Sequence, residues 1–135
     1  MLEERDLAPL SCELEGITAM PAVFDQRWVK RLDGVRVKTG ESKWDLAQQL
    51  IEDIERFRVE NACDRLVMVW CGSTEAYQEP SAVHETLEAF EAGLKADDDN
   101  ISPSQLYVYA ALASGVPFAN GAPNLSTDLK CMEEL

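Results

Sequence analysis

The stretch RLVMVWCG, residues 65–72, decides the fold class. It is the most apolar run of the chain, and it ends abruptly at Gly72. A short apolar run between a charged residue and a glycine is typical of a strand that is buried on both faces of a parallel sheet. Before it, apolar side chains recur every three or four residues from Trp44 to Phe57, which predicts a helix. A helix directly before a buried strand indicates half of a β-α-β unit. Residues 25–32 predict a shorter helix with an aspartate as N-cap.

Further elements follow the strand and complete an α/β pattern. Residues 81–96 carry apolar side chains at helical spacing, and we expect His84 to be exposed in the first turn. Residues 101–115, ISPSQLYVYAALASG, begin with a serine N-cap, a proline at the first helical position and the glutamine of a capping box. Residues 116–118, VPF, predict a second short strand, and residues 125–135 begin another helix. The sequence therefore predicts helices on a small parallel sheet.

Two loops follow the two expected strands. They are CGSTEAY, residues 71–77, and ANGAPN, residues 119–124. Ligands of parallel α/β sheets bind beyond the carboxyl ends of the strands, so neighbouring strands would bring both loops to one crevice. Gly72 would let a ligand approach the main chain, and the serine and threonine after it could donate hydrogen bonds to phosphate or ribose oxygens. The alternatives are an ordinary strand-to-loop transition and a plain Asn-Gly turn.

Composition and charge exclude several classes of function. The chain has 135 residues, 46% of them hydrophobic, which suits one domain with one core. A net charge of −13 argues against a nucleic acid or an anionic membrane surface as partner. The four cysteines form no Cys-x-x-Cys pair and there is one histidine, so we expect no metal site and reduced thiols, as in the cytoplasm. No glycine-rich phosphate fingerprint is present, and the residues alone indicate an α/β domain with a ligand crevice.

Three segments, taken in order, resemble the myo-inositol-phosphate synthase (inositol-3-phosphate synthase) family, and its prokaryotic branch in particular. They are WCGSTEAY at 70–77, ISPSQLY at 101–107 and GVPFANGAP at 115–123. The resemblance implies a Rossmann-like parallel sheet with flanking helices, part of an NAD-binding domain. It also implies an isomerase that converts glucose 6-phosphate to 1D-myo-inositol 3-phosphate by oxidation, intramolecular aldol cyclisation and reduction, in inositol and phospholipid biosynthesis. The expected enzyme is cytoplasmic and homo-oligomeric, a tetramer in this family.

Carried over position by position, the resemblance implies cofactor-binding residues but no catalytic residue and no metal ligand. The residues expected to contact NAD are Cys71, Gly72, Ser73, Thr74, Gly121 and Ala122. The chain departs from the family pattern here, because Cys71 replaces a threonine, Ser73 an asparagine and Ala122 a serine. The resemblance therefore implies backbone contacts to NAD at these positions rather than the family's side-chain contacts. Ser102 and Ser104 match the family's Ile-Ser-Pro-Ser motif, where helix capping accounts for Ser102 without a ligand.

The resemblance also sets an expectation about what the chain is. Residues 1–135 would form a single domain that is part of the Rossmann-like NAD-binding domain of a larger synthase. The family's glycine-rich loop lies upstream of the matching region and its catalytic lysines lie downstream, and neither is found in these residues. We therefore expect the chain alone to be inactive. The alternative is a stand-alone nucleotide-binding or assembly module without catalysis.

Overall fold

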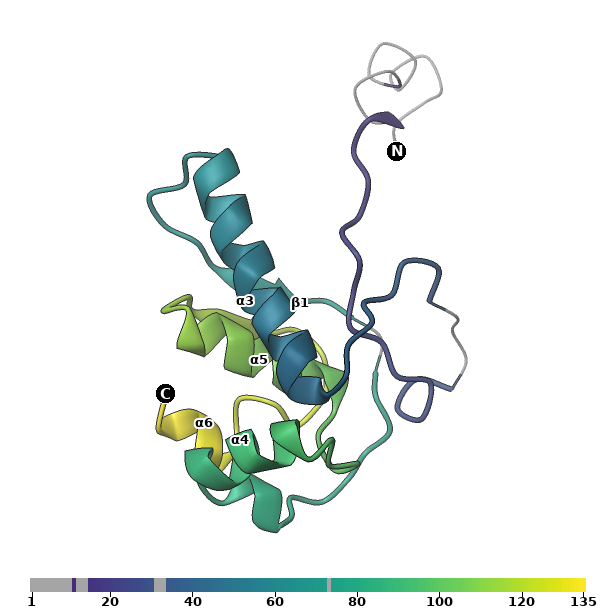
Figure 1. Cartoon of the computed structure of the whole chain (residues 1–135), viewed down its shortest axis with the longest axis vertical. Helices are drawn as coiled ribbons and strands as arrows, with labels where there is room; N and C mark the ends of the chain where they lie inside the picture. Colours follow the sequence, from purple (N-terminus) through teal and green to yellow (C-terminus); the bar gives the residue numbers. More distant parts are fainter. Residues whose placement is uncertain (1–10, 12–14, 31–33, 73) are drawn as a thin grey trace.

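The computed structural model describes residues 11, 15–30, 34–72 and 74–135, and it has a mixed α/β architecture (Figure 1). The principal elements, in chain order, are α3 (Lys43–Glu60), β1 (Met68–Trp70), the 3₁₀ turn η2 (Ala82–His84), α4 (Leu87–Lys95), α5 (Pro103–Ala113), β2 (Phe118–Asn120) and α6 (Lys130–Glu133). The two strands pair in parallel, with Met68 opposite Phe118 and Trp70 opposite Asn120. The predicted parallel sheet with flanking helices is therefore confirmed.

Helix α3 forms where the apolar spacing predicts it. The side-chain oxygen of its N-cap, Ser42, accepts a hydrogen bond from the Asp45 N–H at 3.3 Å. Ala47, Leu50 and Ile54 are buried along one face of the helix. This face packs on α5, so the helical stripe of the sequence is the core-facing side of α3.

Helix α5 is buried on most of its circumference. It begins with the predicted capping box between Ser102 and Gln105 and has Pro103 in its first turn. Just after its end, Gly115 adopts a φ of +66°, a left-handed conformation that favours glycine. The chain then turns directly into β2, so the end of α5 and the start of the second strand are fixed together.

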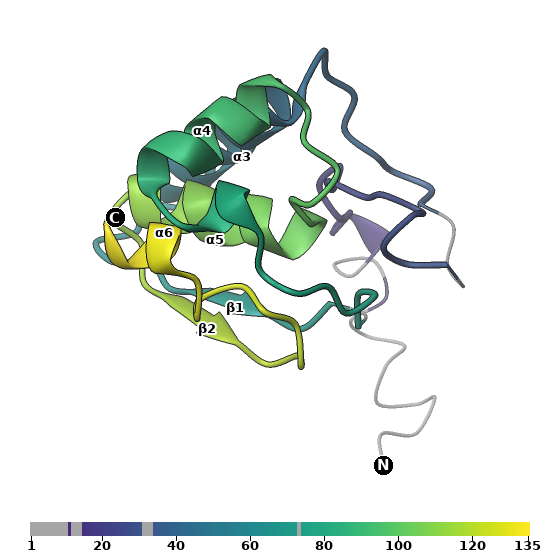
Figure 2. The same ribbon diagram turned by 90° about the horizontal axis from the view of Figure 1, so that it is seen from below.

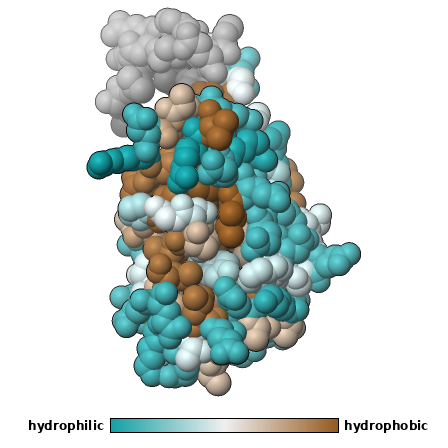
Figure 3. All heavy atoms as spheres, turned by 60° about the vertical axis from the view of Figure 1, so that its left-hand side comes forward, coloured by the Kyte–Doolittle hydropathy of each residue, from teal (hydrophilic) through white to brown (hydrophobic). Residues whose placement is uncertain are grey.

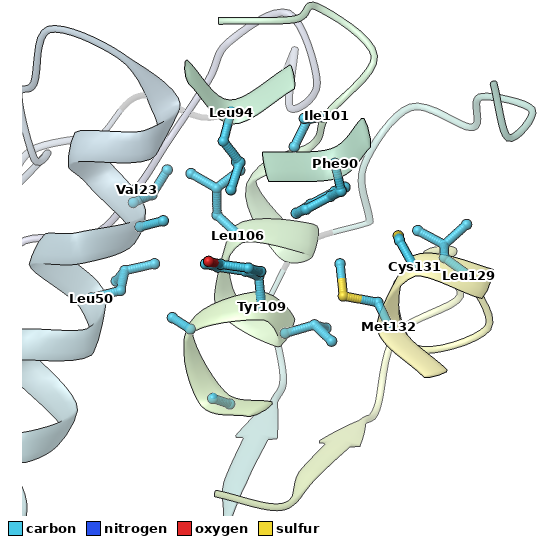
Figure 4. Packing of buried hydrophobic residues seen from close by; sticks show 14 of the residues in the cluster. Val23, Leu50, Phe90, Leu94, Ile101, Leu106, Tyr109, Leu129, Cys131 and Met132 are labelled. Atoms are coloured by element: carbon cyan, nitrogen blue, oxygen red, sulfur yellow. The ribbon is translucent and has the colours of Figure 1, made fainter. Parts of the chain in front are cut away.

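The hydrophobic core lies between the helices (Figure 4). Phe90 and Leu94 of α4 pack against Leu106 and Tyr109 of α5. All four side chains are at most 4% exposed. Helix α6 closes this side with Cys131, which is fully buried. Burial raises the pKa of the Cys131 thiol to about 11, so this thiol is held protonated at neutral pH.

The segment before α3 is attached to the core by polar contacts. The Val23 N–H donates a hydrogen bond to the Tyr107 hydroxyl at 3.0 Å, and Ala22 forms an isolated parallel bridge with Val37. The Lys38 ammonium pairs with the Asp53 carboxylate at 2.7 Å, and both side chains are about nine-tenths buried. This ion pair joins the segment to α3.

Several local predictions are wrong. The second strand is Phe118–Asn120 rather than residues 116–118, and the last helix is Lys130–Glu133 rather than residues 125–135. Strand β1 is not buried on both faces, because the described helices cover only one face of the sheet, and Val67 and Val69 are 64% and 57% exposed (Figure 2). His84 is 3% exposed, because Thr86 caps α4 and separates a short 3₁₀ turn that folds the imidazole inward. Of the helix predicted at residues 25–32, residues 25–30 form turns rather than a helix, and residues 31 and 32 lie outside the described residues.

The surface of the molecule is mixed. Exposed apolar side chains gather on one face between polar ones (Figure 3). A groove of about 400 Å³ runs between α3 and β1, and Ile54, Phe57 and Val69 are among the residues that line it. Within the described residues, no helix has the length and apolar character needed to cross a membrane.

Candidate functional site

The carboxyl ends of β1 and β2 lie side by side, so the two loops that follow them share one edge of the sheet (Figure 2). The Gly121 N–H donates a hydrogen bond to the Trp70 carbonyl at 2.9 Å, which continues the parallel pairing one residue beyond β2. The two expected strands are therefore neighbours, as the predicted crevice requires, while the crevice itself remains a prediction. A site shared by both loops requires that the two strands be neighbours, and β1 pairs directly with β2.

The residues expected to contact NAD are placed as follows. Cys71, Gly72, Thr74 and Gly121 are exposed, and Ala122 is half-buried. Ser73 lies outside the described residues. Backbone and small side chains therefore dominate this edge, which suits a ligand that approaches the main chain closely.

Each of the two glycines has a steric reason to be there. A Cβ atom at Gly121 would lie 2.9 Å from the Trp70 carbonyl oxygen, so a side chain would push the loops apart. A Cβ atom at Gly72 would lie 2.6 Å from the Trp70 indole. That indole packs on the Tyr107 ring, with ring centroids 5.1 Å apart. Gly72 thus makes room for the Trp70 side chain.

The second loop is shaped by the side chain of Asn120. Its Nδ2 donates hydrogen bonds to the Asn124 carbonyl at 2.8 Å and to the Ser126 hydroxyl at 2.9 Å. Its Oδ1 accepts a hydrogen bond from the Ala122 N–H at 2.9 Å. These three bonds close residues 121–126 into a fixed turn, as the Asn-Gly pattern predicts.

A buried polar layer lies behind the loops, and sequence reasoning missed most of it. Glu75 is only 7% exposed, and its carboxylate accepts hydrogen bonds from the Ser104 N–H at 2.8 Å and the Ser104 hydroxyl at 2.6 Å. Its own N–H donates to the Asn124 side-chain oxygen at 3.1 Å. The first loop, the second loop and the start of α5 are thereby joined. The Ile-Ser-Pro-Ser motif was the only sequence signal that pointed to this layer.

Gln105 and His84 extend the same layer. The Gln105 Nε2 donates a hydrogen bond to the Leu125 carbonyl at 3.1 Å, and its Oε1 accepts one from the Ser102 N–H at 3.0 Å. The His84 Nδ1 accepts from the Ser81 N–H at 2.9 Å, and its Nε2 lies 3.2 Å from the Gln105 Oε1. This pattern requires a neutral imidazole with its proton on Nε2, because Nδ1 accepts. Both ring nitrogens of His84 thus take part in hydrogen bonds within the buried layer.

Two buried donors at this edge lack a hydrogen-bond partner within the described part of the chain: Trp70 Nε1 and Asn124 Nδ2. Asn124, Glu75 and His84 also line a small polar cavity of about 20 Å³, enough for roughly one water molecule. No group of three or more metal-binding side chains occurs in the described ranges. The unpaired Asn124 amide faces this buried side of the loops, so a ligand at the exposed edge would meet mainly backbone and small side chains.

Comparison with known proteins connects this geometry to a family. Residues 1–135 match the model of an NAD-binding domain family described as myo-inositol-1-phosphate synthase. The chain is 44% identical over 135 residues to inositol-3-phosphate synthase 1 of Bacteroides thetaiotaomicron, covering 99% of this chain and 32% of that protein. It is 37% identical over 86 residues to inositol-3-phosphate synthase of Saccharomyces cerevisiae, covering 63% of this chain and 16% of that protein.

A solved structure shares the fold. The crystal structure of inositol-3-phosphate synthase from Caenorhabditis elegans matches 98% of this chain and 27% of its own, with a TM-score of 0.89 at 20% sequence identity. The chain thus spans about a third or less of the length of these relatives. Since the family model covers every residue, the chain belongs to the myo-inositol-1-phosphate synthase family and corresponds to its NAD-binding domain.

Proposed function

We propose that this chain is the NAD-binding segment of an inositol-3-phosphate synthase that converts glucose 6-phosphate to 1D-myo-inositol 3-phosphate. The observation that carries the proposal is the pairing of two exposed, glycine-containing loops at the carboxyl edge of adjacent parallel strands. Family membership supports it, since relatives of this chain carry the name inositol-3-phosphate synthase. In this proposal residues 1–135 act as a single domain within a larger synthase.

The residues proposed to hold the cofactor act mainly through their backbone. Gly72 and Gly121 leave the main chain open at the edge, and Cys71 and Ala122 add little bulk. The Thr74 hydroxyl is exposed and can donate to a phosphate or ribose oxygen. Ser73 belongs to the same proposed set. Bound NAD would supply the hydride acceptor for the oxidation and return the hydride in the final reduction.

The residues that perform proton transfer and cyclisation belong to the rest of the proposed synthase. Lys130 is exposed and forms an ion pair with Glu85, which raises the pKa of Lys130 through their hydrogen bond. Lys130 lies on α6 and in neither of the two proposed cofactor loops, so it is not proposed as a catalytic lysine. We also propose a cytoplasmic homotetramer, with glucose 6-phosphate as substrate and neither nucleic acid nor membrane as partner.

A segment exchange tests this function. The aligned 135 residues of the Bacteroides relative are replaced by this chain, and the purified chimera is incubated with glucose 6-phosphate and NAD. We expect inositol phosphate to form, detected by NMR of the product. A chimera that is folded by circular dichroism and has the parent's oligomeric state, but yields no product, would contradict the proposal.

The isolated chain provides the complementary experiment. With glucose 6-phosphate and NAD it should show no turnover, because the reacting groups are proposed to come from other parts of the synthase. Calorimetric titration with NAD should show weak or undetectable binding, since only one wall of the crevice is supplied. Micromolar binding of NAD together with an inactive chimera would favour the stand-alone nucleotide-binding module instead.

A further inference from the structure

We propose that Glu75 is a positioning residue that fixes both candidate NAD loops on the start of α5. This inference rests on the proposed function, because it assigns a role to a residue behind the proposed cofactor site. Glu75 follows directly after Thr74, the last residue of the first loop expected to contact NAD. It is buried, so it serves the site from behind and does not touch the cofactor.

The first step is the bond between Glu75 and α5. Both carboxylate oxygens are used, one by the Ser104 N–H at 2.8 Å and the other by the Ser104 hydroxyl at 2.6 Å. Ser104 is fully buried in the first turn of an 11-residue helix, where free N–H groups and the helix dipole favour a negative charge. The carboxylate is therefore held in one place by charge-assisted hydrogen bonds.

The second step carries this position to the other loop. The Glu75 N–H donates to the side-chain oxygen of Asn124, and the Asn124 carbonyl accepts from the Asn120 side chain at the end of β2. Independently, Gln105 donates to the Leu125 carbonyl from the same turn of α5. The two loops thus share one anchoring point, and the distance between their exposed backbones depends on it.

The third step is the absence of a charge partner. Among the described residues, Glu75 takes part in no salt bridge, so its carboxylate is compensated only by the hydrogen bonds of Ser104 and the helix end. A buried carboxylate costs desolvation, and an apolar side chain would fill the same space at lower cost. A carboxylate at this position instead forms two directional hydrogen bonds to α5, one through each oxygen. Such a pair of bonds fixes the position of the loop.

Hydrogen exchange of the full 135-residue chain tests the anchoring without NAD. We expect Glu75→Ala to speed amide exchange at least tenfold in peptides covering residues 71–78 and 119–126, with no change in α3. Glu75→Gln keeps one acceptor and should show a smaller effect. Glu79→Ala removes an exposed carboxylate that lies two residues after the first loop and accepts a hydrogen bond from the exposed Tyr77 side chain; as the control, it should leave residues 119–126 unchanged. Unchanged exchange in the loops, or an equal rise in α3, would overturn the proposal.

Cofactor affinity in the chimera tests the consequence for NAD. Glu75→Ala should raise the Kd and KM for NAD at least tenfold and leave kcat at saturating NAD within about threefold. A purely structural role would instead reduce the amount of folded enzyme and leave KM unchanged, which would overturn the proposal. If the unsubstituted chimera binds no NAD, the proposed function fails, while the exchange experiment still decides whether Glu75 holds the loops.

A double-mutant cycle tests whether Ser104 is the partner through which Glu75 acts. Ser104→Ala removes the hydroxyl and keeps the N–H, so its effect on loop exchange should be smaller than that of Glu75→Ala. The double variant should resemble Glu75→Ala alone, because both substitutions break the same contact. Fully additive effects would show that the two residues act separately and would contradict the proposed anchor.

Discussion

Substitution of Gly121 by alanine tests the geometry of the proposed cofactor edge most directly. The added Cβ atom would lie 2.9 Å from the Trp70 carbonyl oxygen, which also accepts the Gly121 N–H hydrogen bond at 2.9 Å. Because the clashing atom belongs to the backbone of β1, no side-chain rotation can relieve it. The second loop must therefore move away from the first.

The size of the effect follows from these contacts. Overpacking of a tight site costs about 1–3 kcal/mol, and a weakened backbone hydrogen bond adds about 1 kcal/mol. We expect Gly121→Ala to lower the free energy of unfolding by about 2–4 kcal/mol. For a chain of this size that corresponds to a fall in Tm of roughly 6–16 °C. In the chimera, the displaced loop should weaken NAD binding at least tenfold.

Gly115 provides a matched control at the other end of β2. Its φ of +66° makes alanine unfavourable by about 1–2 kcal/mol, but a Cβ atom there would meet no other atom within 4 Å. Gly115→Ala should therefore lower the Tm and leave NAD affinity unchanged. Urea unfolding and NAD titration of both variants separate stability from binding. If folded Gly121→Ala binds NAD as tightly as the parent chimera, the proposed role of this edge is refuted.

Three further predictions concern the core and its ion pair. Leu94→Ala should lower the free energy of unfolding by about 2–5 kcal/mol in urea titrations, because the side chain is fully buried, whereas Val67→Ala at an exposed position should change it by less than about 0.5 kcal/mol; similar values for both would contradict the core assignment. Lys38→Met should cost about 1.5–3 kcal/mol, because the buried Asp53 carboxylate loses the lysine but keeps its ion pair with Arg56, and an unchanged urea midpoint would show that the Lys38–Asp53 pair is solvated. Burial raises the pKa of Cys131 to about 11 from an ordinary 9.0, so unfolding releases this proton more readily, and stability should be full below pH 9 and fall between pH 9 and pH 11. A Cys131→Ala variant with the same alkaline decline would assign the decline to another group.

The sheet and its edge could be predicted because they depend on local patterns. An apolar run ending in glycine at residues 65–72 and a second short run at 116–118 each mark one strand. Helices α4 and α5 lie between the two strands in the sequence, and α5 has the predicted capping box and proline. This helical crossover lets the two strands run parallel. The position of both loops at one edge of the sheet follows from this topology alone, without knowledge of any side-chain contact.

The burial of individual residues could not be predicted in the same way. Whether β1 is covered on one face or both depends on which layers pack against it, and the apolar run of the sequence is compatible with either. His84 lies in a helical pattern, but a threonine cap two residues later divides that pattern and turns the imidazole inward. Local spacing gives the direction of the backbone more reliably than it gives the surroundings of one side chain.

The polar layer behind the loops depends on partners that are distant in sequence. Glu75 is 29 residues from Ser104 and 49 residues from Asn124, so no local pattern predicts that they meet. Their meeting explains why the resemblance to the family rests on three separate segments. Residues 70–77 and 115–123 supply the two loops of one edge, and residues 101–107 supply the helix start that holds both. A substitution in that helix start should therefore also weaken cofactor binding, although Ser102, Ser104 and Gln105 are buried.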